Sequence, residues 1–133
     1  MTQQFRTIQE TKGSNDFAQL LSDQIYNATL AQNTATSLTV PGGGIMGNIA
    51  SYGGNNDKNY VLAMIRVTFG DEVWVSVSAT AAAPAGSSFA KATSEVVTSD
   101  DPRCIRVPVG SVMSFLTTGT TTSVSVSFYA LPS

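Results

Sequence analysis

The feature that most constrains this chain is a strict alternation of apolar and polar side chains in its C-terminal half. In residues 72–80, EVWVSVSAT, apolar valines and an alanine occupy every second position, and residues 123–130, SVSVSFYA, repeat the pattern. Successive side chains of a β-strand point to opposite faces of a sheet, so a period of two indicates one buried face and one polar face. Both segments are therefore predicted to be half-buried strands.

Turn residues and β-branched residues predict how the remaining strands are joined. The turn FGDE at 69–72 predicts that residues 60–80 form a hairpin, and the loop 118–122 is predicted to pair the strand before it with the last strand. Pro108 cannot donate a ladder hydrogen bond, which places its strand at a sheet edge or beside a bulge. The further predicted strands are 25–30, 37–40, 60–69, 103–109 and 112–117.

About eight short strands thus follow one another, and no helix alternates with them. This spacing predicts an all-β fold, either an antiparallel β-sandwich or a jelly-roll-like barrel. A length of 133 residues suits one domain, which we place at 25–133 after an N-terminal arm at 1–24. An extended arm is the preferred prediction, and a short helix over 16–23, capped by Asp16, is the alternative.

Sparse apolar residues in the arm and on the strands are the candidate contacts for a protein partner. Leu62 and Met64 make both faces of their strand apolar, so this strand is either buried on both sides or meets another subunit. Trp74 falls on the polar face of its strand, where it either covers a second apolar layer or anchors a partner. In the arm, the residues that a neighbouring molecule would bury are Phe5, Ile8, Phe17, Leu20 and Leu21.

Composition narrows the classes of function. Charged residues make up only 12% of the chain, so a partner that covers the surface meets a small desolvation cost, although an extracellular monomer has a similar composition. The seven cations are scattered, which disfavours nucleic-acid binding, and no apolar run is long enough to span a membrane. The lone Cys104 is expected to be a small core residue, with an intermolecular disulfide or a reactive thiol as alternatives.

The residues available for chemistry are few. The chain has no histidine, which removes the commonest general base and metal ligand, and the adjacent acids at 71–72 and 100–101 lie in apparent turns and point apart. We therefore expect no enzyme, cofactor, metal or small-molecule substrate. A weak calcium site at 100–101 or 55–57 is the alternative.

The order of several segments resembles small β-sandwich virion proteins of tailed bacteriophages, of the capsid decoration or cement type. The segments are TSLTVP at 36–41, EVWVSV at 72–77, a predicted surface loop of small residues at 79–88, IRVP at 105–108, VMSFL at 112–116 and VSVSFY at 124–129.

The resemblance implies a homo-oligomer, by preference a trimer, that binds the major capsid protein in the virion after assembly in the host cytoplasm. Two other functions stay open. One is a tail or fibre module that binds host carbohydrate through Trp74, Tyr52 or Tyr129, and the other is another coat or tail assembly subunit.

Overall fold

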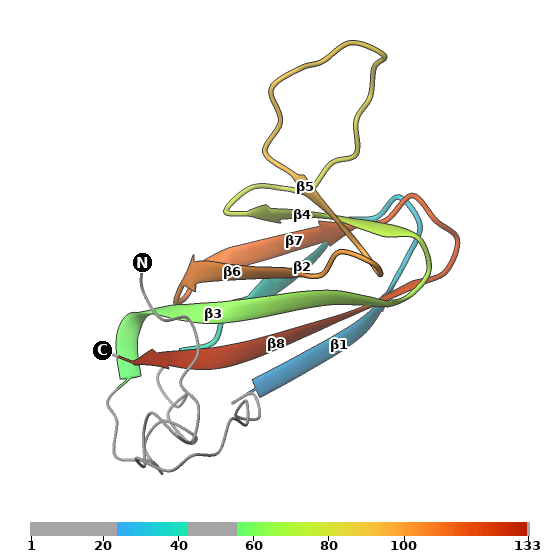
Figure 1. The fold of residues 1–133 in the computed structure, drawn as a ribbon. Helices are drawn as coiled ribbons and strands as arrows, with labels where there is room; N and C mark the ends of the chain where they lie inside the picture. The colour runs from blue at the N-terminus through green and yellow to red at the C-terminus, as the bar shows by residue number, and fades with distance from the viewer. Residues whose placement is uncertain (1–23, 43–55, 133) are drawn as a thin grey trace.

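The computed structural model of the chain describes residues 24–42 and 56–132, and the arm predicted at 1–24 lies almost entirely outside them. No helix occurs in these two ranges, and their strands form two four-stranded antiparallel sheets that face each other (Figure 1). The strands are β1 (Gln24–Leu30), β2 (Thr36–Thr39), β3 (Asn56–Phe69), β4 (Glu72–Val77), β5 (Glu95–Thr98), β6 (Arg103–Pro108), β7 (Val112–Leu116) and β8 (Thr122–Pro132).

The pairing of the strands is nested. β1 pairs with β8, β2 with β7, β3 with β6, and β4 with β5, and every pair is antiparallel. Two lateral pairings, of β3 with β8 and of β4 with β7, join these pairs into sheets of order β1-β8-β3-β6 and β2-β7-β4-β5. This nesting is the strand order of a jelly roll, so the predicted all-β sandwich is confirmed.

The core lies between the two sheets and follows the predicted alternation. The valines of β4 and the apolar residues of β8 from Val124 to Ala130 point inward, where they pack with alternate residues of β3. Burial of these side chains from both sheets supplies the main stabilisation of the fold. Pro108 lies on β6, an edge strand, as its missing donor predicted.

The two predicted strand pairings across short turns are wrong. β3 and β4 lie in different sheets, and so do β7 and β8, so the turn at 69–72 and the loop at 118–122 cross between sheets instead of closing hairpins. β4 also ends at Val77, before the predicted end at 80, because Ser78 takes a left-handed backbone conformation with φ of 64°. β5 was not among the predicted strands.

Two buried threonines hold these crossing connections together. The side chains of Thr117 and Thr122 are 0% exposed, and their Oγ1 atoms lie 3.0 Å apart. The Thr117 hydroxyl also donates to the carbonyl oxygen of Glu72 at 2.9 Å, and the amide of Gly119 donates to Thr117 Oγ1 at 3.1 Å. Polar groups removed from water at this end of the sandwich are thus paired with one another.

Gly70 in the β3–β4 turn fits closely against Thr122 of this pair and the preceding Thr121. Its φ is +102°, and a Cβ there would lie 2.6 Å from both the carbonyl oxygen of Thr121 and Oγ1 of Thr122. We expect Gly70→Ala to lower the free energy of unfolding by about 1–3 kcal/mol, measured by urea denaturation. Gly86→Ala is the matched control, because a Cβ at that position would meet no atom within 4 Å. Equal stability of the two variants would contradict this account of the turn.

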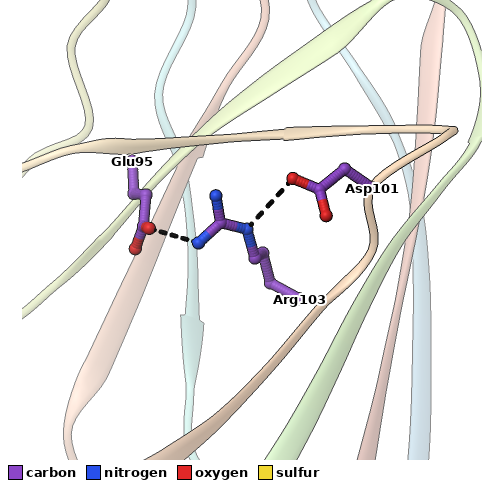
Figure 2. Close-up of polar contacts among 3 residues, drawn as sticks. All are labelled: Glu95, Asp101 and Arg103. Atoms are coloured by element: carbon purple, nitrogen blue, oxygen red, sulfur yellow. Dashed lines mark hydrogen bonds and ion pairs between the residues drawn. The ribbon is translucent and has the colours of Figure 1, made fainter.

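An ion-pair cluster joins the two sheets at the edge formed by β5 and β6. The guanidinium of Arg103 on β6 contacts the carboxylate of Glu95 on β5, and its Nε lies 3.5 Å from Asp101 Oδ2 (Figure 2). Arg103 pairs in register with the inward-facing Ile65, so it points toward the opposite sheet. This contact bridges one open side of the sandwich.

The cluster is partly exposed, so its contribution to stability is small. We expect Arg103→Ala to lower the free energy of unfolding by about 0.2–1 kcal/mol, and the loss to shrink as salt concentration rises. Urea denaturation at low and high salt measures both effects. A loss that does not depend on salt would assign the effect to packing of the arginine stem instead of charge.

Candidate functional site

Glu72, Glu95 and Asp101 make structural contacts. Within residues 24–42 and 56–132 no group of three or more Asp, Glu, His or Cys side chains is placed to hold a metal ion. Asp101 pairs with Arg103, and Glu72 Oε1 accepts a hydrogen bond of 3.0 Å from the Thr118 hydroxyl. No helix in the described ranges is long and apolar enough to cross a membrane. The candidate sites in these ranges are therefore surfaces and pockets.

The predicted patch residues differ in their exposure in the structure. Leu62 points away from the core cluster but is only 1% exposed, so it offers no area to a partner and its assignment to an exposed patch is wrong. The strand is buried on both faces at this point, which was one of the two alternatives. Met64 is half-buried, opposite Cys104 on β6 and Ser127 on β8. The predicted arm contacts, Phe5, Ile8, Phe17, Leu20 and Leu21, lie outside the described residues.

Trp74 is half-buried on the outer face of its sheet. It lies in register between Val96 of β5 and Leu116 of β7, and these three side chains form an apolar row. The indole Nε1 is buried and has no hydrogen-bond partner among the described residues. The ring is thus only partly available to a partner.

The start of the β4–β5 loop folds back over the same sheet. The amide of Ala81 donates to Ser114 Oγ at 2.9 Å, and Ala81 is buried. Beside it lies a wide hollow of about 660 Å³. Apart from Val112, the described residues that line it are small or hydroxyl-bearing, and none of these described residues is charged. Nothing in this lining provides the charge that would hold an ion.

Phe89 is the most exposed of the large hydrophobic residues that the sequence analysis did not single out. It lies in the loop 78–94 between β4 and β5, which projects away from the sandwich (Figure 1), and its side chain is 110% exposed. A surface loop of small residues was predicted at 79–88, and Phe89 is the residue that follows it. The available signal was one large aromatic residue inside a run of Ala, Ser, Thr, Gly and Pro.

An apolar pocket lies at the opposite edge of the sandwich, between β1 and β2. Its volume is about 170 Å³. Tyr26 stands beside it and packs edge-on against Phe128, with ring centroids 5.7 Å apart. β2 is only four residues long, and Ala28 of β1 is small, so this edge is incompletely filled. The lining residues are Tyr26, Asn27, Ala28, Leu30, Thr36, Ser37, Leu38, Phe115, Val124 and Val126.

Cys104 lies on β6, half-buried on the outer face of its sheet, and not in the core between the sheets. Desolvation by burial raises the pKa of its thiol. The thiol is therefore protonated and weakly nucleophilic at neutral pH.

The raised pKa links stability to pH. Because the folded state holds the proton more tightly, the contribution is fully present below the ordinary thiol pKa and is lost as pH rises above it. We expect the unfolding free energy of the native chain to fall relative to that of Cys104→Ser when the pH is raised from neutral to alkaline. Urea denaturation of both proteins at the two pH values measures this. A difference that stays constant would contradict desolvation of the thiol.

Comparisons of the chain with protein-family models, with curated proteins and with solved structures give no match.

Proposed function

We propose that this chain is a structural virion protein that binds assembled capsid subunits and stabilises the capsid. The observation that carries the proposal is the nested jelly-roll order of the strands. Jelly rolls occur in viral capsid domains, in lectins and in cupins. The resemblance of the sequence to decoration proteins of tailed bacteriophages favours the first of these classes.

The chemistry of the chain favours a role in assembly over catalysis. With no histidine in the sequence, metal chemistry through imidazole ligands is not available to this jelly roll. Charged residues are few, and large apolar side chains are exposed on β1 (Ile25), at the end of β3 (Phe69) and in the β4–β5 loop (Phe89). Several apolar contacts on a surface of low charge suit a subunit with neighbours on more than one side.

The mechanism is mass action. A protein that binds the assembled capsid, and not free capsid subunits, stabilises the assembled state by its binding free energy. Copies that associate with each other as a homo-oligomer, by preference a trimer, strengthen the binding through multivalency. Phe5, Ile8, Phe17, Leu20 and Leu21 of the N-terminal region are the proposed contacts with the major capsid protein.

Carbohydrate binding is less well supported by the aromatic residues. Of the rings considered for sugar stacking, Trp74 and Tyr129 are half-buried, and Tyr52 lies outside the described residues. A sugar platform presents an open ring face next to hydrogen-bonding side chains. The fully exposed ring, Phe89, is flanked by Ser88 and Ala90 and suits an apolar protein pocket better.

Cosedimentation tests the proposal. The purified full-length protein is mixed with empty capsids of the encoding phage and, separately, with its unassembled capsid protein. We expect saturable binding to capsids alone, and a rise in the temperature at which the capsids break open. Binding of equal strength to the unassembled subunits, or no binding to capsids, would contradict the proposal.

A second variant tests the predicted contacts of the N-terminal region. Replacing Phe5, Ile8, Phe17, Leu20 and Leu21 by serine is expected to weaken capsid binding at least about tenfold, because each buried apolar side chain contributes about 1.5–3 kcal/mol. The control replaces the three threonines of the same region, Thr2, Thr7 and Thr11, by serine. Undiminished binding of the first variant would remove these residues from the interface.

A further inference from the structure

Phe89 has the features of an anchor side chain. It is the most exposed large hydrophobic residue of the described ranges, and its neighbours Ser88 and Ala90 are small. Nothing lies within 4 Å of a Cβ placed at Gly86, three residues earlier, so the loop is open on this side as well. The ring can enter a narrow pocket without collision of the flanking side chains. Aromatic side chains that fill a pocket are typical of binding hot spots.

The pocket between β1 and β2 matches this ring in size and chemistry. Its volume is about 170 Å³, and apolar cavities of about 150 Å³ bind benzene. Its walls include Leu30, Leu38, Phe115 and Val126, and none of the described residues that line it is charged. A phenyl ring in this pocket would exchange water for contacts with these apolar walls.

Ring and pocket belong to opposite edges of the same molecule. The pocket lies between the edge strands β1 and β2, whereas the loop leads into β5, the other edge strand of the β2-β7-β4-β5 sheet. Phe89 is fully exposed in its own molecule, so it does not fill its own pocket. We infer that Phe89 of one copy inserts into the β1–β2 pocket of a second copy.

The contact is heterologous, because each copy presents the loop at one edge and the pocket at the other. Such head-to-tail contacts close into a ring when the rotation between copies permits it, and each chain supplies one anchor and one pocket. Lys91, two residues beyond Phe89, stays in water at the rim of the contact. The inference rests on the proposed function, in which copies of the chain associate as a homo-oligomer. It identifies the surfaces through which the copies contact each other.

Photo-crosslinking tests the contact directly. Phe89 is replaced by p-benzoylphenylalanine in the full chain, which is mixed at high concentration with a mass-tagged copy, irradiated and mapped by mass spectrometry. We expect crosslinks from position 89 to residues 26–38 of the other copy. Crosslinks within one chain, crosslinks to a different surface, or none between copies would overturn the inference.

Substitutions give an independent measurement. Sedimentation over a range of concentrations is expected to show that Phe89→Ala weakens self-association about tenfold or more, whereas Phe69→Ala, which removes another exposed ring, leaves it unchanged. Ala28→Phe, which fills the pocket from within, is expected to act like Phe89→Ala. If Ala28→Phe does not fold, the comparison of Phe89→Ala with Phe69→Ala alone tests the inference. Equal effects of those two variants, or a native chain that stays monomeric throughout, would overturn the inference.

The capsid assay separates this inference from the proposed function. If the Phe89→Ala variant loses self-association but still sediments with capsids, the result supports both the contact between copies and the capsid role. Native self-association in Phe89→Ala, together with capsid binding, overturns the contact and leaves the proposed function standing. Self-association through Phe89 without any capsid binding keeps the contact and removes the capsid role.

Discussion

The ladder between β3 and β8 is the interaction on which the rest of the structure depends. These are the two longest strands, and their register runs from Asn56 opposite Pro132 to Phe69 opposite Ser123. β8 also carries β1, and β3 also carries β6, so one entire sheet is assembled on this pair. Because its two strands are distant in sequence, the loop-closure entropy is lost before most of the core can form.

The same nesting makes the two edges of the sandwich different. At the β5–β6 edge Arg103 reaches across to Glu95 and Asp101, and charged side chains close the gap between the sheets. At the β1–β2 edge the strands present small or short side chains to the gap, such as Ala28 and Thr36, and the gap remains as an apolar pocket. The two edges of the molecule therefore differ, since one is closed and the other is open. A head-to-tail contact requires two different surfaces on each copy.

Local patterns predicted the strands but not their partners. The alternation in 72–80 and 123–130 correctly gave the buried face, because burial is decided residue by residue along one strand. The turn at 69–72 predicted a hairpin because a tight turn usually joins neighbouring strands. Here Gly70 fits against Thr121 and Thr122, and the chain continues into the other sheet. Leu62 was misassigned for a related reason, since period alone does not tell an exposed outer face from a covered one.

The candidate site escaped prediction because its two parts are defined by long-range geometry. Val124 and Phe115 have the pattern of ordinary core residues, and only their long-range pairing with Ala28 of β1 and Thr36 of β2 places them beside the pocket. Phe89 is not part of a periodic apolar pattern, so the sequence does not identify it as a contact residue. Its exposure results from the loop, which projects away from the sheets. A single exposed ring is common on soluble proteins and by itself indicates no partner. Phe89 is significant because the same chain, which has low charge, also carries a pocket of the size of the Phe89 ring. A repeating contact needs one anchor ring and one pocket in every copy.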